Sequence, residues 1–326
     1  MRKQQLMSGI GASIGILILI LDGKTAVSGG QAGVDLCLRT VIPSLFPFFL
    51  LSIILTNAFM GSPLPLLRPL AKLFSIPNGA ESILVCALFG GYPVGAQCIS
   101  QAYREGQISR NDAQRMLAYC NNAGPAFLFG MIGGIFPDKW TSWILWSIHL
   151  ISALLVATLF PGHSDSVNTP KKIPISVSQA MVSAIKAMAH VCGWVILFRV
   201  IIAFLQRWIL WILPMGLQVM ITGLLELANG CCSLSSIDSV SVRFVLCSGM
   251  LAFGGVCVTM QTISVVNGLS VKYYFVGKGL QTVFSLLLAA GWIWLPQAIL
   301  PAILLFILLI SRKNRKYSRN PAKVGV

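Results

Sequence analysis

Long apolar segments recur along the whole chain, and they constrain its fold more than any other feature of the sequence. A helix that crosses a bilayer needs about 20 predominantly apolar residues. Runs that reach or approach this length lie at residues 6–21, 41–60, 82–100, 116–136, 141–160, 188–213, 215–228, 242–266, 275–294 and 295–310. Of the 326 residues, 56% are hydrophobic and 10% are charged. This pattern predicts an all-α polytopic integral membrane protein with about eight crossings.

The formal net charge of +15 is best explained by membrane topology. The tail at residues 311–326 carries lysines and arginines without an acidic residue, and a second basic segment contains Lys171, Lys172 and Lys186. Short basic flanks mark the cytoplasmic side of bacterial membrane proteins. We therefore expect both termini in the cytoplasm and no nucleic-acid partner. Attraction of the tail to anionic lipid is an alternative use of the same charge. The first apolar run follows Arg2 and Lys3 without a clear cleavage site, which favours a retained helix over a cleaved signal.

Several classes of chemistry lack their sequence signatures. The nine cysteines form no C-x-x-C pair, and the three histidines show no H-E-x-x-H spacing. We therefore expect no metal centre, no disulfide framework and no cofactor. The sequence has no G-x-x-x-x-G-K-[ST] loop for nucleotide hydrolysis and no G-x-S-x-G motif, so an enzyme is not expected.

A polar, proline-containing stretch at residues 161–174 divides the chain into two halves of similar size. We expect an N-terminal transmembrane helix and connection at residues 1–40, a first membrane repeat at 41–160, a polar cytoplasmic linker at 161–187, a second membrane repeat at 188–310 and a basic cytoplasmic tail at 311–326.

Two similar glycine-containing segments lie about half the chain length apart. The segment FGGYPVGAQCIS at residues 89–100 aligns with FGGVCVTMQTIS at residues 253–264. Irregular backbone at membrane depth is tolerated where protein or a water-filled cavity satisfies its polar groups, and interrupted helices at corresponding places mark transporter sites. We therefore predict two related, inverted repeats, each with a re-entrant helical hairpin that faces a cavity. The alternative is that these glycines form close helix-packing surfaces, as the spacing of Gly91 and Gly95 permits.

Polar residues inside the apolar runs are the remaining candidates for a site. Asn121 and Asn122 precede Gly124 and Pro125 at the start of a span, where one amide can cap the helix and the other can line the cavity. Glu226 lies within a span, so it is expected to have a specific function. Glu226 and Arg199 form either a structural ion pair or a coupling-ion site in which Arg199 balances charge or meets an anionic substrate. The residues predicted to line the site are Gly90, Gly91, Tyr92, Pro93, Gly95, Gln97, Asn121, Asn122, Glu226, Asn229, Gly254, Gly255 and Gln261, with Arg199 as a possible charge partner.

The motifs around these residues resemble those of the sporulation integral membrane protein YlbJ family. The similarity is carried by GGYPVGA at residues 90–96, CNNAGP at 120–125, ELANG at 226–230 and FGGVCVTMQ at 253–261. That family is grouped with proteins that carry the nucleoside-recognition Gate domain, which concentrative nucleoside transporters and the ferrous iron transporter share. The resemblance implies a transporter of spore-forming bacteria, and dipicolinate as a cargo. This chain is shorter than the usual members, and the nucleoside label is an analogy.

The residues and the resemblance together predict a membrane transporter of a small polar or anionic organic solute that acts by alternating access. Its expected partners are the solute, the lipid bilayer and a coupling ion, H⁺ or Na⁺; an oligomer is compatible with the sequence. The expected location is the bacterial cell membrane or the membrane around the forespore. The alternatives are a sporulation membrane scaffold that transports nothing and a nucleoside transporter. For a transporter, replacement of Gln97 or Asn122 by alanine is expected to impair flux with little loss of folded protein.

Overall fold

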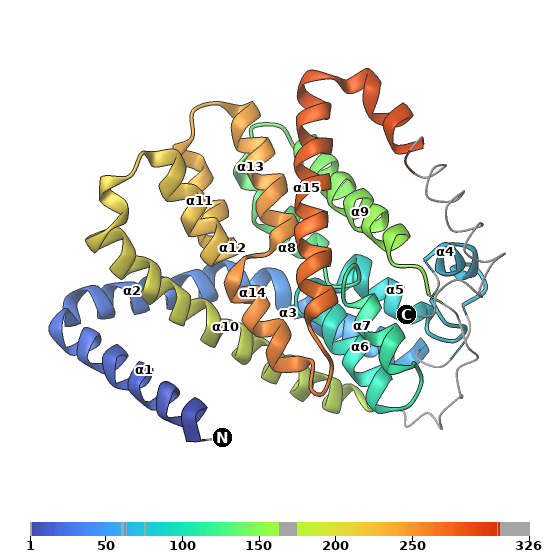
Figure 1. Cartoon of the computed structure of the whole chain (residues 1–326), viewed down its shortest axis with the longest axis horizontal. Helices are drawn as coiled ribbons and strands as arrows, with labels where there is room; N and C mark the ends of the chain where they lie inside the picture. Colours follow the sequence, from blue (N-terminus) through green and yellow to red (C-terminus); the bar gives the residue numbers. More distant parts are fainter. Residues whose placement is uncertain are drawn as a thin grey trace.

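The computed structural model describes residues 2–59, 62, 64–74, 76–162, 175–304 and 306, and this part of the chain is helical without a strand. The expectation of an all-α protein is therefore confirmed (Figure 1). Before the middle of the chain the elements are α1 (Arg2–Leu21), α2 (Gly23–Leu36), η1 (Cys37–Val41), α3 (Ile42–Phe59), α4 (Arg68–Leu73), α5 (Glu81–Val85), η2 (Cys86–Gly90), α6 (Val94–Arg104), α7 (Arg110–Met116), α8 (Pro125–Gly130), η3 (Ile132–Gly134) and α9 (Trp140–Leu159). After it follow α10 (Val177–Trp208), η4 (Leu210–Ile212), α11 (Met215–Leu225), α12 (Leu227–Ser233), η5 (Leu234–Ser236), α13 (Val240–Phe253), α14 (Gly255–Val265) and α15 (Lys272–Trp294).

Five helical segments in the described part are long and apolar enough to cross a membrane. They are Gly23–Phe59, Trp140–Leu159, Val177–Trp208, Val240–Val265 and Lys272–Trp294. Shorter apolar helices, among them Pro125–Gly134 and Met215–Leu225, lie between them. The chain is thus a multi-pass membrane protein, while the predicted total of about eight crossings stays a prediction because the short helices do not span by length alone.

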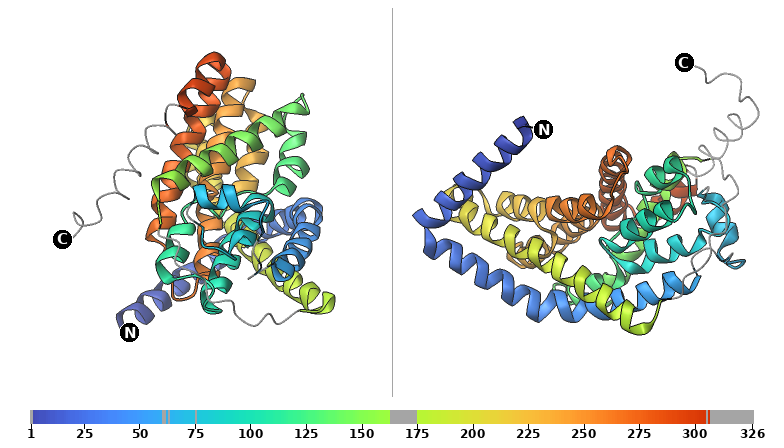
Figure 2. Two further views of the ribbon diagram at one scale, coloured as in Figure 1. Left: turned by 90° about the vertical axis from the view of Figure 1, so that its right-hand side faces the viewer. Right: turned by 90° about the horizontal axis from the view of Figure 1, so that it is seen from below.

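The long helices form two groups. α2 and α3 pack against α10, and the pair α2–α10 is antiparallel because Gly29 lies beside Ala203 whereas Gly33 lies beside Ile196. α9, α13 and α15 form a second group of steeply inclined helices (Figure 1). Helix α1 projects from the end of α2 away from both groups (Figure 2). The first group therefore joins one long helical segment from each half of the chain.

Both glycine segments interrupt a helix, as the sequence predicts. α5 and η2 end at Gly90 and α6 begins at Val94, with Gly91 at a φ of 75°. α13 ends at Phe253 and α14 begins at Gly255, with φ values of 80° at Gly254 and 84° at Gly255. These positive values favour glycine because a Cβ would be strained there. The re-entrant character of the two segments and the repeat relationship stay predictions.

Two helices that follow polar connections begin with side-chain caps. Ser109 caps α7, and its hydroxyl accepts a hydrogen bond from the Asp112 backbone N–H at 3.0 Å. α10 begins at Val177, within the predicted linker 161–187, and Ser176 and Gln179 form a capping box at its start. Most of the polar stretch 161–174 and the whole tail 311–326 lie outside the described residues.

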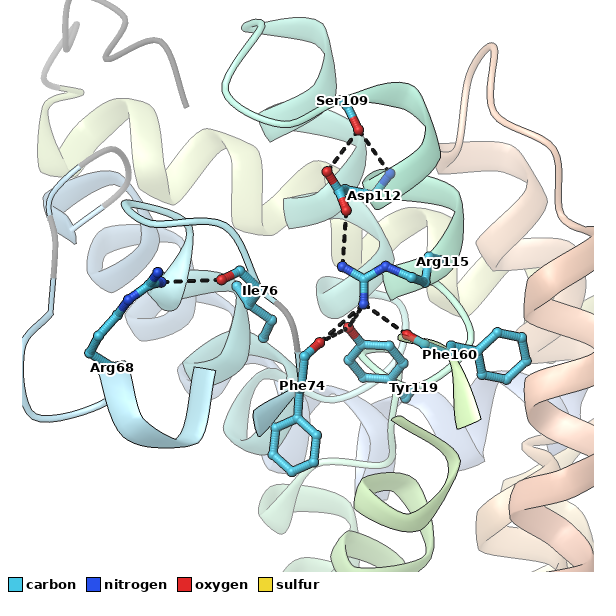
Figure 3. A network of polar contacts seen from close by, with 8 residues as sticks. All are labelled: Arg68, Phe74, Ile76, Ser109, Asp112, Arg115, Tyr119 and Phe160. Atoms are coloured by element: carbon cyan, nitrogen blue, oxygen red, sulfur yellow. Dashed lines mark hydrogen bonds and ion pairs between the residues drawn. The ribbon is translucent and has the colours of Figure 1, made fainter. Parts of the chain in front are cut away.

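A buried arginine fixes the segment that leads to the two asparagines (Figure 3). The Arg115 guanidinium donates at 3.0 Å to the carbonyl of Phe74, the hydroxyl of Tyr119 and the carbonyl of Phe160, and it pairs with Asp112 at 3.0 Å. The carbonyls belong to the end of α4 and the end of α9, so one side chain connects three segments. A buried charge is destabilising unless hydrogen bonds and an ion pair compensate for its lost hydration. Arg115 can be buried here because these partners are present.

Candidate functional site

A small cavity of about 40 Å³ lies where the interrupted helices of the two halves meet. Its walls are Val41, Leu45, Gly91, Tyr92, Ala123, Gly124, Phe127, Val191, Val195, Glu226, Leu227, Ala228, Val258 and Gln261. Most of these side chains are apolar, and the polar ones are those of Tyr92, Glu226 and Gln261. Pockets for organic ligands usually occupy about 300–1,000 Å³. This cavity therefore has room for a few waters or an ion and is too small for an organic solute.

Two glycines bring the first break and the asparagine loop into backbone contact. A Cβ on Gly124 would lie 2.8 Å from the Cα and 2.9 Å from the N of Gly91. Since real Cβ atoms do not approach backbone so closely, both walls of the cavity depend on glycine here. Gly95 packs in the same way on the carbonyl of Cys120. Gly91 therefore lines the cavity and also permits close backbone packing, whereas Gly95 permits close packing without lining the cavity.

Glu226 caps a short helix from inside the cavity wall. It lies at the break between α11 and α12 with 3% of its surface exposed. Its Oε1 accepts from the Ala228 N–H at 3.0 Å, and its Oε2 accepts from both the backbone N–H and the side-chain amide of Asn229 at 2.7 Å. The carboxylate thereby satisfies N–H groups that α12 cannot pair internally. Glu226 and Asn229 therefore form one unit.

Arg199 does not join this unit through an ion pair. Its guanidinium donates to Gln206 at 3.3 Å, and it lines a separate, more polar pocket of about 580 Å³ with Asp22, Lys24 and Arg207. Arg207 pairs with Asp22 at 3.2 Å, and among the described residues no ion pair links Arg199 to Glu226. The structural ion pair that the sequence suggests is therefore absent from this conformation, because Glu226 finds its partners at the start of α12.

Asn121 connects the two interrupted helices. Its Oδ1 accepts from the Ala96 N–H at 3.3 Å, in the first turn of α6, and its Nδ2 donates to the Thr262 hydroxyl of α14 at 2.9 Å. The expectation that one asparagine caps the helix that follows is wrong, because no side chain caps α8 and Asn121 bonds instead to α6, a helix that precedes it in the chain. The following helix, α8, begins with Gly124 as its N-cap and Pro125 in its first turn.

Asn122 belongs to a fully buried polar network. Its Nδ2 donates to the carbonyls of Ala87 at 3.3 Å and Tyr119 at 2.7 Å, and its Oδ1 accepts from the Gln281 amide at 2.9 Å. Gln281 is fully buried on α15, and its amide also lies 3.4 Å from the His149 carbonyl of α9. Because all these polar atoms are shielded, replacement of Asn122 leaves several of them unpaired. The expectation of little loss of folded protein for Asn122→Ala is therefore revised by the contacts.

Lys278 extends this network to the cavity. Its Nζ donates to the Gln281 Oε1 and to the Tyr92 hydroxyl, both at 2.8 Å, and the side chain is 2% exposed. The Tyr92 hydroxyl in turn donates to the Leu251 carbonyl at 3.1 Å, and a Cβ on Gly254 would lie 3.2 Å from the Tyr92 ring. Tyr92 therefore joins the first break to the second break and to α15.

The predicted site residues fall into three sets. Gly91, Tyr92, Glu226 and Gln261 line the cavity. Asn121, Asn122, Asn229 and Gly254 contact the lining residues or the break segments. The remaining members, Gly90, Pro93, Gly95, Gln97 and Gly255, form the backbone of the two break segments and do not line the cavity, and Gln97 is half-buried on α6.

Sequence reasoning missed Lys278, Gln281 and His149 as members of the network. Lys278 and Gln281 are one helical turn apart inside the apolar run 275–294, so both project from the same face of α15. The rule that singled out Glu226, an ionisable residue within a span, applies equally to Lys278. His149 has no local signal, because its partner, the backbone N–H of Ala123, comes from another segment.

The sequence is similar to one protein of known name along most of its length. The sporulation integral membrane protein YlbJ of Bacillus subtilis (strain 168) is 24% identical over an alignment of 318 positions, gaps included, that covers 82% of this chain and 77% of the relative. No family model matches the chain, and no solved structure matches it. The similarity supports the YlbJ family that the glycine and asparagine motifs indicate.

Proposed function

From the similarity of this chain to the sporulation integral membrane protein YlbJ, we propose that it transports a small polar or anionic organic solute across a bacterial membrane during sporulation. The observation that carries the proposal is the convergence of the helix breaks on one cavity. Gly91 and Tyr92 of the first half face Glu226 and Gln261 of the second half across it. Interrupted helices at the interface between two halves are the usual architecture of a transporter's central site.

The size of the cavity supports an alternating-access cycle. At about 40 Å³ the cavity cannot hold an organic solute, so the described conformation corresponds to a closed state without one. Opening requires movement at residues that can change backbone angles, and Gly91 and Gly254 are placed at the two breaks. The hydrogen bonds of Tyr92 and Asn121 across the two halves would have to separate or shift during that movement.

The remaining elements of the proposal concern energy, substrate and orientation. The sequence has no nucleotide-hydrolysis loop, so a gradient of H⁺, Na⁺ or the solute itself supplies the energy. A planar dicarboxylate such as dipicolinate is the first substrate to test, with a nucleoside as the alternative. Both termini face the cytoplasm in this proposal, because the basic segments flank them.

The proposal is tested by flux measurements on purified protein in lipid vesicles. Radiolabelled pyridine-2,6-dicarboxylate uptake is measured under imposed H⁺ and Na⁺ gradients, with nucleosides as competitors. The informative variant is Gln261→Ala, because Gln261 lines the cavity and its one hydrogen bond in the described structure is a weak contact with the Cys257 sulfur at 3.3 Å. Gln101→Ala on α6 is the matched control, since Gln101 bonds to the exposed Glu105.

We expect flux in the wild type and in Gln101→Ala, and a strong reduction in Gln261→Ala with an unchanged amount of folded protein. If nucleosides inhibit the measured uptake and unlabelled dicarboxylates do not, the substrate class is nucleosides. Absence of flux for both solutes in folded wild-type protein would reject the transporter and favour the scaffold.

A further inference from the structure

We propose that Lys278 recognises a carboxylate group of the transported solute, and that the Tyr92 hydroxyl occupies the place of that carboxylate in the closed conformation. This inference rests on the proposed transport function and specifies which side chain of the protein meets the anionic group of the solute. The evidence consists of the burial of Lys278, the neutrality of its partners, its connection to the cavity through Tyr92, and a second buried donor without an acceptor nearby.

Lys278 is a buried amine without a carboxylate partner. It is 2% exposed and lies inside α15, a helix long enough to span a membrane. Ion pairs within the described part of the chain join Arg68 to Glu81, Arg115 to Asp112 and Arg207 to Asp22, and none includes Lys278. Its two partners are the neutral oxygens of Tyr92 and Gln281. In its protonated form the group has three N–H donors, so one is left for a further acceptor.

The energetics favour an anion as the missing partner. A charged group in an apolar interior is strongly destabilising unless an opposite charge and hydrogen bonds compensate for lost hydration. Ionisable residues within membrane spans usually mark substrate or ion pathways for this reason. A carboxylate that bound Lys278 would supply both the charge and the acceptor, and such charge-assisted bonds are about twice as strong as neutral ones.

The path from the cavity to Lys278 passes through one side chain. Tyr92 lines the cavity, and its hydroxyl accepts the Lys278 hydrogen bond while the Nζ lies 4.8 Å from the centre of its ring. Tyr92 follows Gly91 at the first break, and its ring rests on Gly254 at the second. Movement at either break therefore displaces the phenol and opens Lys278 to the cavity.

A second donor without an acceptor lies in the same network. His149 is 1% exposed, and its Nε2 accepts from the Ala123 N–H at 3.0 Å, which leaves the hydrogen of a neutral ring on Nδ1. That Nδ1 has no hydrogen-bond partner in the described structure. Ala123 lines the cavity, so the His149 imidazole contacts a residue of the cavity wall from behind. Unused donors on Lys278 and His149 together match a ligand rich in acceptors.

The other positive feature of the cavity is already neutralised. The N-terminus of α12 carries the Glu226 carboxylate, which takes the backbone N–H groups of Ala228 and Asn229. A solute anion would have to compete with this covalently attached carboxylate at that position. Lys278 is therefore the position in the network at which an added negative charge is favoured.

The test compares charge-selective transport and binding in three variants. Lys278→Gln removes the charge, Lys278→Arg retains it, and Lys272→Gln is the matched control because Lys272 is exposed at the first residue of the same helix. The probes are pyridine-2,6-dicarboxylate and its uncharged diamide. The readouts are KM for flux in vesicles and the rise in melting temperature of detergent-solubilised protein at saturating dicarboxylate.

We expect Lys278→Gln to raise KM for the dicarboxylate about tenfold to hundredfold, the loss typical of a hydrogen bond to a charged group, and to abolish its preference over the diamide. Lys278→Arg should retain that preference, and Lys272→Gln should match the wild type. Tyr92→Phe frees Lys278 while the ring stays, so its KM for the dicarboxylate should fall. Misfolding would not lower KM, so a fall in KM for Tyr92→Phe distinguishes the inference from a general loss of structure.

An unchanged KM and an unchanged melting shift in Lys278→Gln would overturn the inference while the transport proposal stands. A raised KM in Tyr92→Phe would also overturn it, because the phenol would then bind the solute itself. If the wild type shows no flux, a dicarboxylate melting shift that disappears in Lys278→Gln keeps the anion site and rejects transport. Absence of both flux and shift in folded wild type rejects both.

Discussion

Replacement of Glu226 by glutamine tests whether this residue is a structural cap or a coupling group. The carboxylate accepts three hydrogen bonds, from one backbone N–H on Oε1 and from the backbone and side chain of Asn229 on Oε2. A glutamine has one acceptor oxygen and places an NH₂ group where the second oxygen stood. The Asn229 side-chain amide can rotate to offer its own oxygen to this NH₂, but the Asn229 backbone N–H cannot.

The magnitude follows from the bond that cannot be rescued. Glu226→Gln leaves one buried backbone N–H without an acceptor and weakens the remaining cap bond by removing its charge. Hydrogen bonds to charged groups contribute about 1.5–3 kcal/mol each, so the expected loss of unfolding free energy is about 3 kcal/mol. At about 2 °C per kcal/mol for a chain of this size, the melting temperature should fall by about 6 °C.

A thiol-reactive fluorescent dye provides the assay, because most of the nine cysteines are buried and react when the protein unfolds. Glu105→Gln is the control, since Glu105 is exposed and a loss of its hydrogen bonds at the surface should change the melting temperature by less than about 1 °C. If Glu226→Gln melts like the wild type and yet abolishes flux under an ion gradient, the cap interpretation is refuted and Glu226 acts in coupling.

Three further substitutions test the packing of the site. Arg115→Met should lower the free energy of unfolding by about 3–5 kcal/mol because it leaves a buried carboxylate unpaired, whereas the exposed Arg110→Met should change it by less than about 0.5 kcal/mol in the same melting assay. Gly95→Ala should reduce the yield of monodisperse protein in size-exclusion chromatography, since its Cβ would overlap a carbonyl oxygen; Gly193→Ala, which has open space, should not. Asn122→Ala should lower the melting temperature by several degrees, and an unchanged value would contradict the buried network.

The helix interruptions could be predicted from the sequence because their cause is local. Gly90, Gly91 and Pro93, and the glycine pair at 254 and 255, favour backbone conformations that a regular helix does not use. Their position in both halves of the chain also indicated that they meet. A small cavity with Tyr92 and Gln261 in its wall lies between them.

The roles of the polar residues could be predicted less well because their partners are distant in the chain. The sequence offers Arg199 as a possible charge partner for Glu226, whereas the Glu226 side chain bonds to residues two and three positions ahead. Lys278 shows the opposite case, since its partner Tyr92 is 186 residues away. A single sequence shows which residues are out of place in an apolar run, but not which of the distant groups will satisfy them.

The close contact between α2 and α10 has a consequence for how the protein sits in its membrane. Gly29 and Gly33 bring the backbone of α2 close to that of α10, which has 32 residues. At about 1.5 Å per residue α10 is roughly 48 Å long, well beyond the hydrocarbon thickness of about 30 Å. A helix of this length must incline or extend into the headgroups. Helix α2 packs closely against it and therefore follows the same inclination. Bilayer thickness therefore acts on this helix pair, and α10 also packs against α14, the helix that begins at the second break.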